Sequence, residues 1–312
     1  MSEYVYGNTP TFLGAKWAVD KDERGADVVI YGVPWEGGVT WGDYTGVELG
    51  PKSMRIASAR YSGYLPELDH IDVFESLSLA DMGDVDIIPA EVENTMHRIS
   101  SFSKDVWNKK VFPVALGGDH SITYPIVKGW SESNPGKKLG IIHLDAHYDN
   151  MNDFNGDLYA RNTPFARLYE MDAVVNSSLV HAGIHGPRNK PESGKFARDA
   201  GAITRTVNEF KETNDLRALA RDLYKQASKD VDAVYLSICS DVLDHAYNPG
   251  GPVDTNGLTS YELLTVIHEL GKQGLCGMDF VEVYPQQDPT DFSSHLASTV
   301  ILYVLAGHAE RI

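Results

Sequence analysis

Residues 140–149 read Gly-Ile-Ile-His-Leu-Asp-Ala-His-Tyr-Asp, and this stretch decides how the fold is interpreted. Its apolar beginning follows a Pro-Gly-Lys-Lys turn, a pattern typical of a buried strand. Asp145, His147 and Asp149 stand two apart, so their side chains point to one face if the strand continues through them. Carboxylates and an imidazole at the end of a central strand can bind a divalent cation such as Mn, Ni, Fe or Zn. The alternative is an exposed strand end followed by an Asx-type turn.

The chain is predicted to form a single domain over residues 1–312. It is 42% hydrophobic, enough to bury one large core or two modest ones, and no Pro-, Gly- or Ser-rich linker divides it. Residues 1–25 are polar and aromatic without periodicity, so we expect an N-terminal arm rather than a core element.

The composition indicates a cytoplasmic protein. No apolar stretch reaches the ~18 residues of a membrane span, and no basic region precedes an apolar run at the amino terminus. Only two cysteines are present, which suits a reducing compartment. The formal charge of -17 would repel nucleic acids and anionic membranes, so neither is an expected partner, whereas a small cationic substrate would be attracted.

Predicted strands alternate with predicted helices along the chain. Short apolar runs indicate buried strands at 28–33, 77–84, 111–116, 179–184, 233–238 and 277–283, besides the one that begins at 140. Helical periodicity and start signals indicate helices at 52–62, 90–108, 121–131, 207–228, 259–271 and 291–306. This alternation predicts an α/β fold with a mainly parallel sheet covered on both faces, and a ligand site at the carboxyl ends of the strands.

A second motif, Gly117-Gly-Asp-His-Ser121, follows the strand predicted at 111–116. Its two glycines allow the backbone to turn tightly, and in a parallel sheet His120 then lies at the same end as Asp145. The Gly-rich loop at 34–46 is too long for a simple turn, and long loops between core elements often carry function.

Four motifs together resemble the ureohydrolase family, which includes arginase, agmatinase, guanidinobutyrase, guanidine hydrolase and biguanide hydrolases. They stand in the family's order and spacing as Gly117-Gly-Asp-His-Ser121, Asp145-Ala-His-Tyr-Asp149, Ser237-x-x-x-Asp241-x-x-Asp244 and Asp279-Phe-Val-Glu282. The similarity extends from about Val28 to the last predicted helix. It implies a three-layer α/β/α arginase-like fold, trimers or hexamers, and two divalent ions, Mn or Ni, that activate a hydroxide to attack a guanidinium carbon and release urea.

The resemblance assigns roles to individual residues. The family's metal ligands are matched by His120, Asp145, His147, Asp149 and Asp241. Asp145 would bridge the two ions. Glu282 matches the carboxylate that pairs with the substrate guanidinium, an interaction suited to a planar, delocalised cation.

Cys239 is the first departure from the family pattern. After the strand that corresponds to the one predicted at 233–238, the family has the motif Ser-x-Asp-x-Asp, and the first Asp of this motif bridges both ions. In this chain Cys239 stands at that position. A thiolate binds Zn or Ni, yet it offers one ligand atom where a carboxylate offers two. We therefore expect the ion content to fall to one or none.

Arg161 is the second departure, within Arg161-Asn-Thr-Pro-Phe165, which matches the family's His-Gly-Thr-x-Phe segment. The resemblance implies that the family His passes protons to the leaving amine, and an arginine cannot do so near neutral pH because its pKa exceeds ~12. Its fixed charge would oppose metal binding, or its guanidinium could stand in for a missing cation. His245, where the family usually has Pro, is either neutral or a replacement nitrogen ligand.

Three functional hypotheses follow. In the first, the chain has lost dinuclear catalysis and is the structural or regulatory partner of an active paralogue, as in a two-subunit biguanide (metformin-type) hydrolase. In the second, it is an active ureohydrolase that uses one ion or an ion bound by Cys239. In the third, it is a binding protein that holds a guanidinium compound through Glu282 without turnover.

The candidate catalytic residues are Glu282, Asp149 and Arg161, and the candidate substrate-binding residues are Glu282, Trp35 and Asn150. Trp35, like Trp41 and Tyr44 in the same loop, could line the pocket or pack against a neighbouring subunit.

Other polar residues leave the substrate open. His143 and His181 lie inside predicted strands, so we expect satisfied core histidines there rather than metal ligands. Arg188, with Arg161, could meet a substrate carboxylate, whereas Asp153 and Asp157 would favour a cation.

Overall fold

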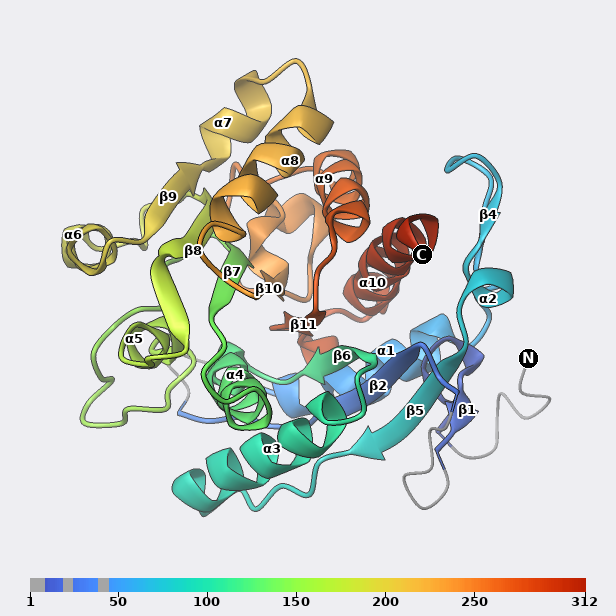
Figure 1. The fold of residues 1–312 in the computed structure, drawn as a ribbon, viewed down its shortest axis with the longest axis horizontal. Coiled ribbons are helices and arrows are strands. Elements are labelled where there is room, and N and C mark those ends of the chain that lie inside the picture. The colour runs from blue at the N-terminus through green and yellow to red at the C-terminus, as the bar shows by residue number, and fades with distance from the viewer. Residues whose placement is uncertain (1–8, 19–24, 39–44) are drawn as a thin grey trace.

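The computed structural model describes residues 9–18, 25–38 and 45–312. Trp41 and Tyr44, both singled out in the Gly-rich loop, lie outside the described residues. The described chain has three layers, with a parallel sheet between two layers of helices (Figure 1). The predicted α/β/α fold class is confirmed.

Nine strands of the described chain form the central sheet, in the order β1-β5-β2-β6-β11-β10-β7-β8-β9, and every neighbouring pair is parallel. Their bounds are β1 Lys16–Trp17, β2 Val28–Val33, β5 Leu79–Asp84, β6 Phe112–Gly117, β7 Leu139–Leu144, β8 Val174–Ile184, β9 Ile203–Thr206, β10 Ala233–Cys239 and β11 Gly277–Val281. A separate antiparallel pair consists of β3 Tyr64–Leu65 and β4 Ile71–Asp72. Strands β2, β6 and β7 are buried along their whole length, as expected where helices cover both faces of a sheet.

Helices cover both faces of the sheet (Figure 1). One face packs against α1 Gly50–Ser58, α2 Val73–Ser76, α7 Val207–Glu212, α8 Leu216–Ala227, α9 Ser260–Gln273 and α10 Phe292–Arg311. The other packs against α3 Val92–Trp107, α4 Thr123–Ser133, α5 Pro164–Tyr169 and α6 Pro191–Ala200. The short 3-10 helices are η1 Phe12–Gly14, η3 Val47–Leu49, η4 His120–Ile122, η5 Ser240–Val242, η6 His245–Tyr247 and η7 Pro285–Gln287. Because side chains alternate along a strand, Ile141 and Ile142 belong to the apolar clusters on opposite faces.

Helix ends follow local sequence signals. Thr259 and Glu262 form a capping box at the start of α9, and the left-handed Gly274 ends this helix. The helix predicted at 207–228 is instead two helices, α7 and α8. Asp215 starts the second one because its side chain accepts a hydrogen bond from the Ala218 amide at 2.9 Å.

The described N-terminal residues differ from the expected arm. Phe12 is fully buried in one apolar cluster, and β1 extends the sheet beside β5. A buried ion pair anchors this segment, since Arg55 Nε and Nη2 each lie 2.9 Å from an oxygen of Asp81, and Asp81 also accepts the Phe12 amide. An aperiodic stretch could not reveal this packing, because its partners lie far along the chain.

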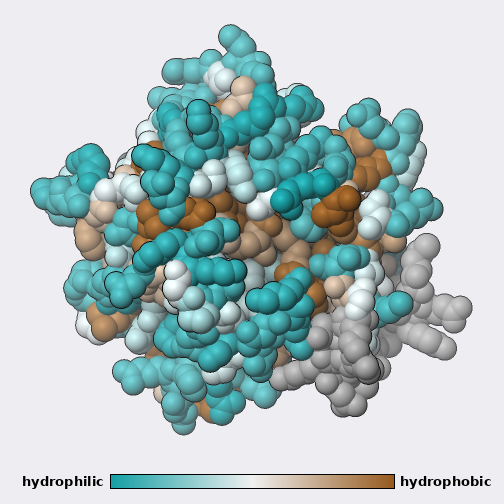
Figure 2. Space-filling view, viewed as in Figure 1, coloured by the Kyte–Doolittle hydropathy of each residue, from teal (hydrophilic) through white to brown (hydrophobic). Residues whose placement is uncertain are grey.

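The face of the molecule drawn in Figure 2 is mainly hydrophilic. Figure 2 shows hydrophilic residues over most of the viewed face, with apolar residues in small patches. Within the described ranges, no helix is both long enough and apolar enough to cross a membrane.

The strand order brings four strand ends together. β6, β11, β10 and β7 are neighbours in the sheet although β10 and β11 come late in the sequence. Since these strands are parallel, their carboxyl ends share one edge, where α/β proteins bind ligands.

Candidate metal and substrate site

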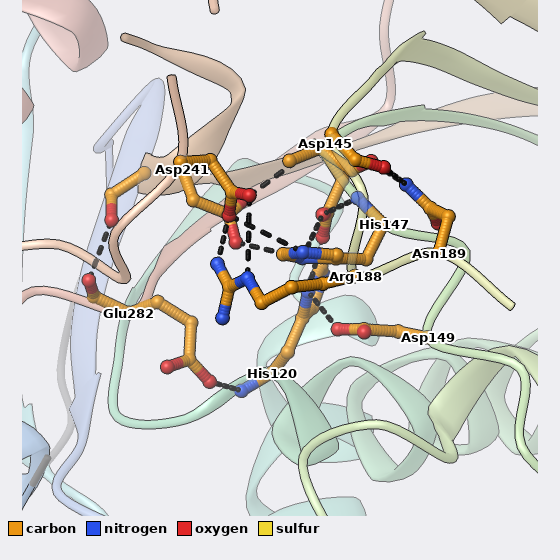
Figure 3. A network of polar contacts seen from close by, with 12 residues as sticks. His120, Asp145, His147, Asp149, Arg188, Asn189, Asp241 and Glu282 are labelled. Carbon is orange, nitrogen blue, oxygen red and sulfur yellow. Dashed lines mark hydrogen bonds and ion pairs between the residues drawn. The ribbon is translucent and has the colours of Figure 1, made fainter. Parts of the chain in front are cut away.

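The segments at these four strand ends carry the candidate residues (Figure 3). His120 opens η4 after β6, Asp145 is the first residue after β7, Cys239 ends β10, and Glu282 follows β11. All four side chains are buried. The sheet thus gathers polar groups that lie far apart in the sequence.

A turn, rather than the strand itself, brings the candidates after β7 together. β7 ends at Leu144, so the condition that the strand continues through Asp149 is not met. The Asp145 side chain accepts a hydrogen bond from the His147 amide, as in an Asx-type turn, and Asp149 has a left-handed φ of 44°. The turn that we weighed against a metal site is therefore present, but it is buried and forms part of the site.

An inner ligand group consists of His120, Asp145 and Cys239, whose potential ligand atoms lie within 4.8 Å of one another. His120 Nδ1 is 3.0 Å from an oxygen of Asp145 and 3.0 Å from one of Asp149, without hydrogen-bond geometry to either. The other nitrogen, Nε2, lies 3.0 Å from the Ser237 hydroxyl, which donates to Asp279. A buried nitrogen that faces two carboxylates without a hydrogen bond is a position that a cation would satisfy.

An outer ligand group consists of Asp145, His147 and Asp241, again within 4.8 Å of one another. His147 Nδ1 lies 3.0 Å from Asp241 Oδ2 and 3.5 Å from Asp145 Oδ1. The Ala146 amide donates to the other Asp241 oxygen at 3.1 Å. Asp145 belongs to both groups, so its position suits the bridging role that the resemblance implies.

Cys239 contributes to the inner ligand group alone. Its side chain is 1% exposed, and burial, followed by the charges of Asp145 and Asp241, raises the pKa of the thiol well above its ordinary value. The thiol therefore keeps its proton at neutral pH unless a cation displaces it. It also packs in the apolar cluster with Val281.

The imidazoles and carboxylates of the two ligand groups shift one another's pKa values. Burial lowers the pKa of His147, but the charge of Asp241 and hydrogen bonds to Asp145 and Asp241 raise it to about 10. Burial opposes protonation of His120 as well, yet Asp145 and Asp149 hold its pKa well above the ordinary range. For Asp149, burial and then the charge of Asp145 raise the pKa to about 6. Each imidazolium thus balances carboxylates that would otherwise repel one another.

Glu282 is held on both oxygens by groups of the same chain. Oε1 accepts the His120 amide at 2.7 Å, and Oε2 accepts the hydroxyl of Tyr284. Arg161 donates to the same hydroxyl, and its Nη1 lies 3.7 Å from Glu282 Oε2. A second carboxylate, Glu36, lies 3.4 Å from Arg161 Nη2. Burial lowers the pKa of Arg161, but Glu282 and its neighbours raise it overall, so this guanidinium stays charged.

Arg161 therefore does not occupy the metal position that we considered for it. Among the described residues, the carboxylates that pair with it are those of Glu282 and Glu36, outside both ligand groups. The sequence analysis did not identify Tyr284 as a site residue. The sequence alone does not show that its hydroxyl hydrogen-bonds to the Glu282 carboxylate two positions earlier.

Trp35 differs from both alternatives considered for it, and the replacement-ligand alternative for His245 gains no support. Trp35 is 1% exposed and donates Nε1–H to the Ser121 hydroxyl at 3.1 Å, so it packs in the core rather than lining the cavity or meeting a neighbouring subunit. His245 opens η6 and belongs to neither ligand group, so the structure gives no support for a replacement ligand there. Asn150 does line the cavity, with its Nδ2 donating to the Ser193 carbonyl at 3.0 Å.

His143 and His181 are buried and hydrogen-bonded, as predicted. Burial lowers the pKa of His143 to about 4, so the ring is neutral, and its Nε2–H donates to Asp145 Oδ2 at 2.9 Å. Its Nδ1 must then accept from His181 Nδ1–H at 2.7 Å, and His181 Nε2 accepts the Tyr169 hydroxyl at 2.6 Å. This chain of donors fixes the orientation of the Asp145 carboxylate.

Arg188 and Asp254 complete the site, and Asp254 was missed entirely. Arg188 pairs with Asp254, which also lies 3.3 Å from His147 Nε2. Nothing in the sequence around Asp254 marks a site residue, since its role depends on a loop from another strand. The cavity above the ligand groups measures about 360 Å³, and its lining includes Asn150, Arg161 and Arg188.

Comparison with known proteins identifies the family. The sequence profile of the arginase family matches residues 26–307. The chain is 30% identical to guanidinopropionase of Pseudomonas aeruginosa over 309 residues, which cover 98% of this chain and 93% of that protein. It is 30% identical to agmatinase of Bacillus subtilis over 285 residues, 90% and 92% of the two chains. The solved structure of proclavaminate amidino hydrolase from Streptomyces clavuligerus superimposes with a TM-score of 0.88 at 28% identity, covering 99% of each chain. The chain therefore belongs to the arginase family, as its motifs predict.

Proposed function

We propose that this chain is a non-catalytic, structural or regulatory subunit of a metal-dependent hydrolase that cleaves a C–N bond of a guanidino or biguanide compound and releases urea. Its partner is a catalytic homologue of the same family in a mixed trimer or hexamer. Membership of the arginase family supports the reaction class. Relatives named for guanidinopropionate and agmatine support a small guanidino substrate.

The contact between Arg161 and Glu282 carries the proposal. The resemblance assigns Glu282 to the substrate guanidinium, and here the chain's own guanidinium lies 3.7 Å from it. Both Glu282 oxygens already accept hydrogen bonds, from the His120 amide and the Tyr284 hydroxyl. A substrate would have to displace a buried, charged side chain to reach this carboxylate.

The ligand groups fit a pair of divalent ions only in part. The inner group would hold one ion and the outer group the other, and ions bound in this way supply hydroxide at neutral pH. Cys239, with one ligand atom and a raised pKa, does not replace a bridging carboxylate. We therefore propose a lowered ion content for this chain, whether the family's metal is Mn or Ni.

Urea release tests the proposal. The purified chain is assayed with Mn or Ni on guanidine, agmatine, guanidinobutyrate and a biguanide, alone and after co-expression with a catalytic homologue. We expect no urea from the chain alone and urea from the mixed oligomer. Turnover by the isolated chain at the rate of the mixed oligomer would overturn the proposal.

A second candidate is an active ureohydrolase with one ion or a Cys239-ligated ion. The observation in its favour is that both ligand groups keep three potential ligand atoms within 4.8 Å of one another. Cys239→Asp separates the two candidates. If the thiolate is a metal ligand of an active enzyme, the substitution lowers or alters the native activity. If the chain is an inactive subunit, there is no native activity for the substitution to change.

A further inference from the structure

Arg188 places a positive charge beside the outer ligand group. Its guanidinium meets Asp254 side-on, with Nε 3.3 Å from Oδ1 and Nη2 paired with Oδ2. Asp254 is 3% exposed, and its Oδ2 lies 3.3 Å from Nε2 of His147, a member of that group. A single buried carboxylate thus links the Arg188 cation to a candidate metal ligand.

The backbone at Gly186 leaves room for the contact between Arg188 and Asp254. Arg188 follows β8, whereas Asp254 is 66 positions further along the chain. Gly186 has a φ of +85°, and a Cβ there would lie 2.8 Å from Asp254 Oδ1, so a residue with a side chain would push Asp254 away. The ion pair is therefore a built feature of the site rather than a contact between two exposed side chains.

The guanidinium of Arg188 shares a cavity with carboxylates of the site. Arg188 lines the same cavity as Asp149 and Asp241, and its side chain projects among the labelled cluster residues in Figure 3. Burial lowers the pKa of Arg188, while the charges of Asp241, Asp145 and Asp149 favour its charged form. A fixed positive charge at this place balances the acids and repels a further cation.

We infer that Arg188, anchored by Asp254, is a resident counter-ion for the carboxylates Asp145 and Asp241 and opposes the binding of an outer divalent ion. This deepens the proposed function and rests on its assignment of the ligand groups. Arg161 has a different task, because its partners are Glu282 and Glu36. Two resident guanidiniums thus occupy the site, one beside the substrate carboxylate and one beside the outer ion position.

Metal uptake by Arg188→Gln tests the inference. Wild type and variant are dialysed against chelator, then titrated with Mn or Zn, and bound metal per subunit is measured by elemental analysis and calorimetry. Removing a charge within a few ångströms of the site should raise the affinity for the outer ion at least about tenfold. The variant should also melt at a lower temperature than wild type in chelator, and added metal should restore its melting temperature.

Three further variants make the result specific. Arg188→Lys keeps the charge and should take up metal as wild type does. Arg198→Gln removes an exposed charge from α6 and should change neither metal uptake nor melting. Asp254→Asn releases the anchor of Arg188 and should raise metal uptake, which keeps the inference testable if Arg188→Gln does not fold.

Opposite outcomes overturn the inference. If Asp254 merely supports His147 as a metal ligand, Asp254→Asn and Arg188→Gln lower metal affinity instead of raising it. Two tightly bound ions in the wild type would also contradict it. Metal uptake and melting are measured independently of urea release. If they contradict the role of Arg188, the mixed-oligomer proposal still stands. Turnover by the isolated chain, in turn, overturns the mixed-oligomer proposal without deciding the role of Arg188.

Discussion

Arg161 and Glu282 form a buried contact in which Arg161 Nη1 and Glu282 Oε2 lie 3.7 Å apart. The Tyr284 hydroxyl is hydrogen-bonded to both side chains. The two residues are far apart in the sequence, and the strand order brings them together. The resemblance assigns Glu282 to the substrate guanidinium, so under the proposed function this contact puts the Arg161 side chain where a substrate would otherwise bind.

Arg161→Ala should open Glu282 to an external guanidinium. Burial raises the pKa of Glu282, and the charge of Arg161 partly offsets this rise, which leaves the pKa at about 7, so a nearby cation helps to keep this group ionised. We expect methylguanidine to bind the variant at least about tenfold more tightly than wild type, measured by calorimetry at pH 8.

The matched control is Arg161→Ala combined with Glu282→Gln. This double variant keeps the enlarged cavity and lacks the carboxylate, so it should lose the gain in binding. Equal methylguanidine binding by the single and double variants would show that Glu282 is not the guanidinium-binding group.

Cys239→Asp should raise the metal content of the chain, because a carboxylate offers two ligand atoms and ionises at neutral pH whereas the buried thiol does not. Elemental analysis after exposure to Mn checks this. Cys276→Ser, at a position outside both ligand groups, serves as the control for cysteine removal. An unchanged metal content in Cys239→Asp would mean that Cys239 is not what limits ion binding.

His143→Gln should reduce the acid sensitivity of the metal-free fold. The pKa of His143 is about 4 in the folded chain and about 6.5 when unfolded, so the unfolded state binds the extra proton. The neutral His143 ring therefore makes its full contribution to the free energy of unfolding above pH ~6.5. This contribution, about 3 kcal/mol in total, is lost as the pH falls toward ~4.

Urea unfolding in chelator between pH 7 and pH 4 measures this effect as the difference between wild type and variant. Carboxylates with raised pKa values act in the opposite direction in both proteins, so their contributions cancel in that difference. Parallel curves for the two proteins would contradict the neutral assignment of His143.

Arg55→Leu should destabilise the fold by about 3 to 5 kcal/mol, because it leaves the fully buried Asp81 without its cation. Urea unfolding measures the loss, and Lys52→Gln, at an exposed position of α1, is the control and should stay within about 0.5 kcal/mol of wild type. A loss below about 1 kcal/mol would mean that this ion pair contributes little to the stability of the fold.

Most of the fold could be predicted from local sequence. The strand at 28–33 is bounded as predicted, and β6, β10 and β11 lie within one or two residues of their predicted positions. Their apolar runs can be recognised because a strand buried on both faces has no polar side. The candidate ligands could be named for a similar reason, since each ends such a run or lies within a few residues of its end.

The sequence by itself determined the α/β class, the family and the identity of the candidate ligands, because strand ends and short motifs are local. Only the tertiary structure decided that Trp35 packs in the core, that Arg161 meets Glu282, and that Arg188 meets Asp254 across 66 positions of sequence. The physical reason is that an ion pair depends on where two loops meet in space. That meeting is fixed by the order of strands in the sheet, and no local pattern encodes it.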